Sequence, residues 1–157
     1  MQRKGFIKIN LRIFNNYPKF NINKSITNRI LKFLQSKEKR AIDSVSIILT
    51  TDKEVNKLKK EYYNQDVLTD TISFNLNAPE QPVEGEIYLS GDRIQENAHQ
   101  FNVEVEYELA NVLIHSILHL LGYDDTTQSN KNQMFEIQNR YLEEINFQGL
   151  LKTKEQS

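Results

Sequence analysis

The sequence predicts an α+β fold, in which a small mixed four-stranded sheet is packed with about five helices. The observation behind this is the order of periodic segments: strand, helix, strand, helix, two strands and then three helices. The length of 157 residues suits one domain with one core, 1–157. About 1–150 are expected to fold, and 151–157 to form a polar tail.

Four segments predict the strands. In GFIKINLRIF (5–14) apolar side chains alternate with basic or polar ones, which is typical of a half-buried strand. Three further short runs carry β-branched or aromatic residues, and they are DSVSIILTT (43–51), TDTISFNL (69–76) and GEIYLS (85–90). The last two are separated by NAPEQPVE (77–84), which holds two of the three prolines and predicts a loop.

Two segments predict the helices that precede and follow the second strand. NKSITNRILKFLQSKEK (23–39) has apolar residues three or four apart and basic residues on the opposite side. Thr51 or Asp52 is expected to cap a second helix over KEVNKLKKEYYN (53–64). The inward face of this second helix is expected to hold Val55, Leu58 and Tyr62.

Three more helices are expected after the sheet. The segment 91–102 predicts a short helix that opens at Asp92. The segment 104–122 is the most apolar, with acids in its first turn that suit the helix dipole and with Gly122 as a left-handed C-cap. The last amphipathic helix is expected over Ser129–Glu144.

Composition excludes several classes of protein. There is no cysteine, which excludes a disulfide scaffold, a thiolate metal site and a cysteine nucleophile. The start, MQRKGFIKIN, lacks the apolar core of a secretory signal, and no apolar run approaches the ~20 residues of a membrane span. We therefore expect a cytoplasmic protein that does not contact membranes.

The net charge of −1 hides a strong asymmetry along the chain. Residues 1–40 carry eleven Lys or Arg and one acid, a net charge of +10, whereas residues 41–157 carry a net charge of −11. A basic segment attached to an acidic remainder favours contact with a polyanion such as nucleic acid. The alternative is a set of solvated faces that happen to be basic.

Two of the three histidines lie four residues apart in HSILHLLGYDD (115–125). On a helix this spacing places the rings of His115 and His119 on one face, where both can bind one metal ion. Gly122 then ends the helix, and Asp124 or Asp125 can return toward the ion as a third ligand. The alternative is that both histidines are ordinary core or surface residues and that the acids merely close a turn. His99 is expected on the surface of a helix.

A hydrolytic zinc site has three protein ligands and an open position for water. A metal site at the end of this central helix, with one zinc ion per chain held by His115, His119 and either Asp124 or Asp125, would meet that requirement. Zinc peptidases with the H-E-x-x-H motif place Glu directly after the first His, but this chain has Ser116 there, which argues against a peptidase.

The same stretch resembles the YbeY-type endoribonucleases, also known as ribosomal RNA maturation factors (UPF0054), whose pattern is H-G-x-L-H-L-x-G-Y-D-H. Seven positions of the pattern match, at His115, Leu118, His119, Leu120, Gly122, Tyr123 and Asp124. Further similarity lies in DVLTDTISFNL (66–76) and GEIYLS (85–90), so the resemblance covers roughly residues 45–145. Ser116 replaces the glycine of the pattern, and Asp125 stands at the third metal-binding histidine.

The resemblance implies a zinc-dependent, single-strand-specific endoribonuclease that acts in ribosomal RNA maturation and ribosome quality control. Its implied partners are single-stranded ribosomal RNA and the small ribosomal subunit with its proteins. In that role His115, His119 and Asp125 are the expected catalytic and metal-binding residues. Because Asp125 replaces a neutral imidazole, water at the site should be less acidified, and manganese or another divalent ion competes better with zinc.

A second departure from the family is Tyr63, at a position where the family usually has an arginine thought to grip phosphate. Lys59, Lys60 or Arg93 could take over that role, or Tyr63 could stack on a base. Basic residues of the first helix are expected to draw in the RNA backbone, namely Arg29, Lys32 and Lys39. Ser73 could donate a hydrogen bond to phosphate or simply face solvent.

A rival hypothesis is a ribosome-assembly factor that binds RNA, cuts nothing and holds a structural metal. The sequence favours it in two respects, because no acid–base partner is visible beside the histidines and the expected arginine is missing. Replacing both histidines separates the two hypotheses, since a structural ion would be needed for folding.

Overall fold

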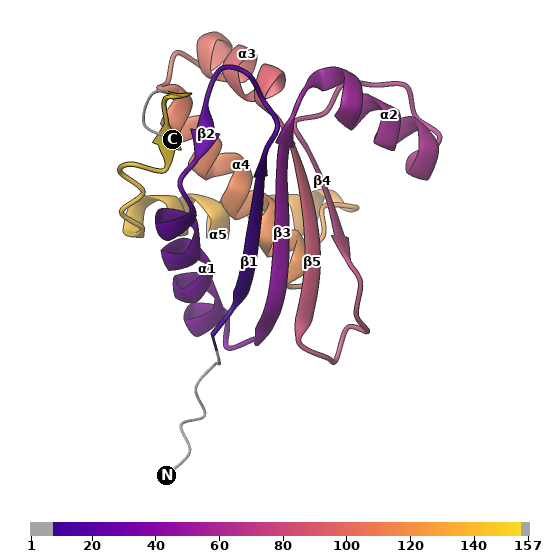
Figure 1. Cartoon of the computed structure of the whole chain (residues 1–157). Helices are drawn as coiled ribbons and strands as arrows, with labels where there is room; N and C mark the ends of the chain where they lie inside the picture. The colour runs from indigo at the N-terminus through magenta and orange to yellow at the C-terminus, as the bar shows by residue number, and fades with distance from the viewer. Residues whose placement is uncertain (1–7, 155–157) are drawn as a thin grey trace.

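The sheet is mixed and four-stranded, as predicted. In the computed structural model, which describes residues 8–154, the strands lie in the order β1–β3–β5–β4 (Figure 1). They span Asn10–Asn15 (β1), Ile42–Thr50 (β3), Val83–Ser90 (β5) and Thr71–Asn75 (β4). The first three run parallel, and β4 pairs antiparallel with β5 at one edge of the sheet.

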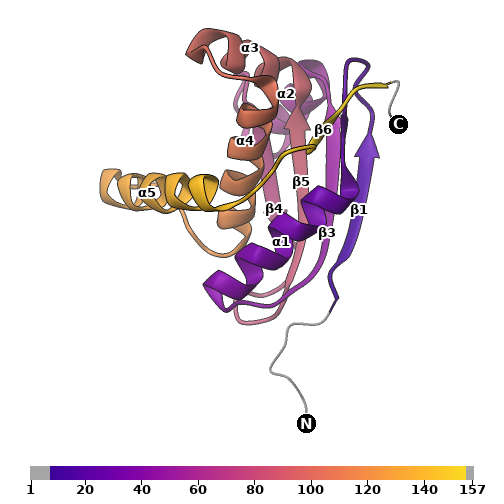
Figure 2. The ribbon, with the colours of Figure 1, turned by 90° about the vertical axis from the view of Figure 1, so that its left-hand side faces the viewer.

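Residues 8–154 also form five helices, as predicted. They span Lys24–Glu38 (α1), Asp52–Tyr63 (α2), Gly91–Phe101 (α3), Val105–Leu120 (α4) and Gln128–Glu144 (α5). Figures 1 and 2 show α1, α4 and α5 on one side of the sheet, whereas α2 lies at the opposite end of the sheet from α1, near β4 and β5. The edge strand β4 and the middle of the chain's most apolar helix, α4, are therefore neighbours.

The period-2 pattern of the strands puts their apolar side chains against the helices. Buried strand residues on that side include Leu11, Val45, Ile47, Ile87 and Leu89. The register pairs Thr71 with Leu89 and Ser73 with Ile87, and directly opposed residues share a face of the sheet. The hydroxyls of Thr71 and Ser73 therefore lie on the side of the sheet that faces α4.

Helix α4 is the centre of the hydrophobic core. Its fully buried side chains include Leu109, Leu113, Ile114, Ile117 and Leu118. It packs against α3, α5 and β4, so apolar residues occur around most of its circumference rather than along one stripe. Side chains that project from α4 toward β4 are consequently held on a rigid element.

The structure differs from the sequence expectation at both ends of the chain. Strands β2 (Asn21–Ile22) and β6 (Leu151–Lys152) form an antiparallel pair that we did not predict. The start of the expected polar tail is thus a strand, and residues 155–157 lie outside the described residues. The first strand was expected from Gly5, but β1 begins at Asn10, and residues 1–7 are also outside the described part.

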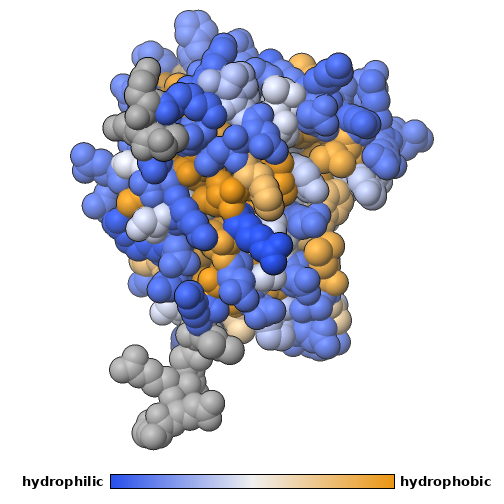
Figure 3. Space-filling model, viewed as in Figure 1, coloured by the Kyte–Doolittle hydropathy of each residue, from blue (hydrophilic) through white to orange (hydrophobic). Residues whose placement is uncertain are grey.

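The side of the sheet away from α4 is partly open to solvent. In Figure 3 this face shows hydrophobic residues in its middle and beneath α2, surrounded by polar ones. Tyr62 was expected to face inward from α2, but 61% of it is exposed, so that expectation was wrong. Between residues 8 and 154, no helix combines the length and apolar character that a bilayer crossing requires.

Candidate metal centre

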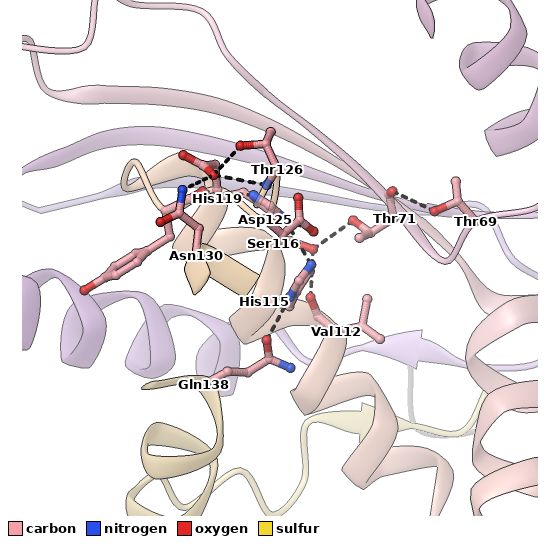
Figure 4. Close-up of polar contacts among 12 residues, drawn as sticks. Thr69, Thr71, Val112, His115, Ser116, His119, Asp125, Thr126, Asn130 and Gln138 are labelled. Carbon is pink, nitrogen blue, oxygen red and sulfur yellow. Dashed lines mark hydrogen bonds and ion pairs between the residues drawn. The ribbon is translucent and has the colours of Figure 1, made fainter. Parts of the chain in front are cut away.

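His115 and His119 project from the last turns of α4 toward each other (Figure 4). Their Nε2 atoms are 3.0 Å apart, and each ring is partly buried. Two nitrogens bound to one zinc ion at ~2.0–2.1 Å cannot be more than ~4.2 Å apart, so this pair satisfies that condition. The helical spacing predicted from the sequence therefore places the two rings as a metal site requires.

The other ring nitrogen of each histidine is held by a polar partner. His115 Nδ1 lies 2.8 Å from Gln138 Oε1, and His119 Nδ1 lies 3.0 Å from the carbonyl oxygen of Tyr123. Both partners are acceptors, so each Nδ1 carries the proton and each Nε2 keeps a free lone pair. Metal-binding histidines commonly have such partners, which fix the tautomer and the orientation of the ring.

The two acceptors are themselves positioned by the fold. Gln138 is buried on α5, and its Nε2 donates a hydrogen bond of 2.7 Å to Asn111 Oδ1 on α4. The Tyr123 hydroxyl donates to Glu38 Oε1 at 2.7 Å, which ties the turn after α4 to the end of α1. The orientation of both rings thus depends on contacts between α4, α5 and α1.

The turn after α4 is set by Gly122, as predicted. Its φ of +109° is in the range that favours glycine, and its N–H donates to the His119 carbonyl at 3.1 Å. The guanidinium of Arg40 donates to the Leu121 carbonyl at 2.9 Å, which satisfies one of the last acceptors of the helix. The chain consequently reverses and brings residues 123–127 beside the histidines.

The two acids in this turn have different surroundings. Asp124 Oδ1 accepts hydrogen bonds from the Thr126 N–H, the Thr126 hydroxyl and Asn130 Nδ2, at 3.1, 2.8 and 2.9 Å. These bonds, the Thr126 N–H first, hold the pKa of the Asp124 carboxyl below its ordinary value. Asp125 Oδ2 instead lies 3.7 Å from His119 Nε2. The donor atoms of His115, His119 and Asp125 all lie within 4.8 Å of one another and could hold a metal ion.

Asn substitutions at the two acids are expected to separate their roles. Asp125→Asn should weaken zinc binding by at least about 10-fold, because an amide oxygen carries no charge for the ion. Asp124→Asn keeps an acceptor for Thr126 and should change the zinc dissociation constant by less than about 3-fold. Titration of each variant with zinc against a chromophoric chelator measures both constants. A larger loss in Asp124→Asn than in Asp125→Asn would reverse the assignment.

An open cavity of about 530 Å³ lies in front of these three residues. It runs between the end of α4, strand β4 and the end of α2. The other residues that line it are Lys59, Tyr63, Thr69, Asp70, Thr71, Ile72 and Ser73. The cavity therefore joins the three candidate ligands to the edge strand that precedes them in sequence.

Burial changes the acid–base properties of two residues in the cavity. Desolvation, followed by the charge of His115, lowers the pKa of His119 despite the opposing effect of Asp125. A lowered pKa keeps this imidazole neutral, which is the form that binds metal. Desolvation also raises the pKa of Asp70, although the charge of His115 opposes the rise. Asp70 is therefore a candidate proton carrier. The sequence alone did not identify it, because the burial that raises its pKa depends on tertiary packing.

Ser116 connects the histidine turn to β4. Its hydroxyl donates to the Val112 carbonyl at 2.7 Å, and the Thr71 hydroxyl lies 2.8 Å away (Figure 4). Since Ser116 has already used its single proton, Thr71 is the donor in that second contact. Ser73 lines the same cavity, and its Oγ is buried without a hydrogen-bond partner among the described residues. Ser73 therefore does not simply face solvent.

Several residues expected near the site lie elsewhere. None of the basic residues of α1, Arg29 and Lys32 included, lines the cavity, and neither does Lys39, which follows α1. Helix α1 packs against β1, at the sheet edge opposite β4. His99 is exposed on α3, as expected, and takes no part in the candidate ligand group.

Comparison with known proteins agrees with this geometry. The family model described as Endoribonuclease YbeY matches residues 12–146, which include both sheet edges and all three candidate ligands. This chain belongs to the YbeY endoribonuclease family. The resemblance inferred from the histidine motif is thereby confirmed, and so is the predicted α+β fold.

Curated YbeY relatives match over much of their length. The Endoribonuclease YbeY of Chlorobaculum tepidum is 36% identical over 132 residues, which cover 84% of this chain and 95% of that protein. The Endoribonuclease YbeY of Thermotoga sp. strain RQ2 is 42% identical over 102 residues, covering 64% of this chain and 67% of that protein. A solution structure of a Thermotoga maritima protein has a TM-score of 0.62 at 34% identity, covering 86% of this chain and 88% of that one.

Proposed function

We propose that this protein is a zinc-dependent endoribonuclease that cleaves single-stranded ribosomal RNA in the cytoplasm. In this proposal it acts in the maturation and quality control of the small ribosomal subunit. The observation that carries the proposal is the group of His115, His119 and Asp125 at an open cavity, in a chain that belongs to the YbeY endoribonuclease family. Catalytic hydrolysis needs this combination of few protein ligands and access for solvent.

The donor chemistry fits a divalent cation. Two neutral imidazole nitrogens and one carboxylate form a ligand set that zinc accepts, and the ring orientations are already set by Gln138 and the Tyr123 carbonyl. Within residues 8–154 no fourth His or acid completes this group. A divalent ion held there supplies Lewis acidity toward a phosphodiester oxygen and acidifies water.

The remaining cavity residues have roles that follow from their chemistry. Asp70, whose pKa is raised by burial, can hold a proton and pass it to or from a reacting oxygen. Ser73 Oγ, which lacks a partner among the described residues, can donate to a phosphate oxygen after a small rotation. In this proposal Asp70 supplies the acid–base partner whose apparent absence in the sequence favoured the rival binding-factor hypothesis.

The proposal is tested by cleavage of a fluorescent single-stranded RNA with protein expressed and purified in nuclease-free form. We expect cleavage to stop after treatment with a strong chelator and to return on addition of one equivalent of zinc or manganese. The same sequence in a perfect duplex should be cleaved at least about 10-fold more slowly, because the cavity must admit an unstacked strand. Cleavage that persists unchanged with chelator would contradict a metal-dependent mechanism.

A further inference from the structure

Exposed hydrophobic side chains concentrate in residues 62–68, which include Tyr63 of the cavity wall and lead directly to Thr69, another lining residue. Among the nine large hydrophobic residues that the described chain exposes, four lie between residues 62 and 68. We call Tyr62, Tyr63, Val67 and Leu68 the rim patch; they are 61%, 45%, 52% and 54% exposed. Such a concentration next to a cavity is typical of a binding surface, whereas single exposed hydrophobic residues are not informative.

Tyr63 belongs both to the rim patch and to the cavity wall. Its ring stacks on Phe74 of β4, with a centroid distance of 6.3 Å and an interplanar angle of 17°. Phe74 in turn makes edge contacts with Tyr62 and Tyr88, at 5.4 and 6.2 Å. The Tyr63 ring is thus supported from one side by an aromatic cluster, while nearly half of its surface reaches solvent at the cavity.

Lys59 supplies the positive charge of this rim. Its Nζ lies 4.6 Å from the centroid of the Tyr63 ring, and Lys59 precedes Tyr63 by one helical turn on α2. It is the one Lys or Arg among the described residues that line the cavity, and the lining also includes Asp70 and Asp125. A phosphate that enters the cavity therefore meets one lysine side chain, which contacts the ring of Tyr63.

We propose that Lys59 and Tyr63, with the rim patch around them, form a subsite for one unpaired nucleotide adjacent to the reacting phosphodiester. The inference rests on the proposed ribonuclease function. The ammonium group of Lys59 binds the phosphate of this nucleotide, and its base stacks on the exposed part of the aromatic cluster. A cation beside an exposed aromatic ring matches single-stranded RNA, because each nucleotide carries one phosphate and one flat base.

A nucleotide fits this rim better than a protein segment does. The rim is continuous with the cavity through Lys59 and Tyr63, so its occupant must extend from whatever the metal site holds. A purely apolar partner would remove water from the Lys59 ammonium without offering it a hydrogen-bond acceptor, which is costly. The base sits where stacking does not depend on its identity, so the subsite predicts a preference for unpaired strands rather than for a sequence.

The test uses a 2′-O-methyl RNA 12-mer with 2-aminopurine at successive positions, and a gel confirms afterwards that it stays intact. Stacking on an aromatic ring quenches 2-aminopurine, so wild-type protein should quench at one or two positions. Tyr63→Leu keeps an apolar side chain but should abolish the quenching and weaken binding about 5- to 150-fold. Tyr63→Phe should restore both.

Lys59→Gln is tested by the salt dependence of binding to the same oligonucleotide. Loss of one phosphate contact should reduce the slope of log K against log[salt] by about 0.7. Lys57→Gln is the matched control, because Lys57 also lies on α2 but does not line this cavity. The slope for that variant should equal the wild-type slope.

Two outcomes would overturn the subsite. One is equal quenching by wild type and Tyr63→Leu, and the other is an unchanged salt slope in Lys59→Gln. Failure of the ribonuclease proposal would give a different result. Wild-type protein would show position-specific quenching and the expected salt slopes, but it would not cleave unmodified RNA with any added metal. Wild-type protein that cleaves RNA but quenches at no position would refute the subsite alone.

Discussion

Replacing His119 by Ala is expected to lower RNA cleavage by at least about 10³-fold, because the change removes one of two imidazoles that face a common point. The same change should abolish binding of a stoichiometric divalent ion. His115→Ala should have an effect of similar size, because His115 supplies the other imidazole of the pair and Gln138 orients its ring. Cleavage rates and metal content of purified variants measure both effects.

The matched control is His99→Ala, because His99 is the third histidine and lies exposed on α3, outside the candidate ligand group. Cleavage by that variant should equal wild-type cleavage. The rival hypothesis of a structural ion predicts that His119→Ala loses its cooperative melting transition. We expect the transition to remain, because the apolar core around α4 does not depend on the two histidines. Wild-type cleavage in a folded His119→Ala variant would contradict the catalytic assignment.

Gly91→Ala is expected to produce a large loss of stability, about 1–3 kcal/mol of the free energy of unfolding. A Cβ at this position would lie 2.4 Å from Cδ2 of the Tyr17 ring. The ring cannot easily move, because it is almost fully buried and its hydroxyl lies 3.0 Å from Asp92 and 2.8 Å from Gln95. Urea denaturation with an unchanged m-value measures the loss.

Gly85→Ala is the control for this second prediction. Its Cβ would lie 2.6 Å from Cδ1 of Leu120, which is the tip of a flexible side chain rather than a ring. A rotamer change relieves that contact, so the loss of stability should be smaller than in Gly91→Ala. Equal midpoints for the two variants would show that the Tyr17 ring is free to move.

The sequence allowed the main elements and the centre of the candidate site to be predicted. The spacing of apolar residues and the capping residues predicted the positions of α1 to α5. Thr51 caps α2, and Gly122, which has a positive φ, follows the end of α4. The i, i+4 spacing places the two histidines on one face of the helix, whatever the helix packs against. Interactions of this kind are readable from sequence because they involve neighbours along the chain.

The features that could not be predicted depend on contacts between distant segments. The burial of Asp70, which raises its pKa, arises where β4 packs beside α4. The strands β2 and β6 have only two residues each, too few for a pattern. The positive charge of residues 1–40 is plain in the sequence, but α1 packs at the sheet edge opposite β4, and no Lys or Arg of residues 8–40 lines the cavity.

The three candidate ligands come from two kinds of backbone, and this division has an evolutionary consequence. Two are anchored in a helix buried in the core, whereas the carboxylate of Asp125 is on a solvent-exposed turn with 45% of its side chain accessible. A single codon change at that turn can exchange a hard oxygen donor for a softer nitrogen donor without disturbing the interior. The donor at this position can therefore be altered with little risk to folding.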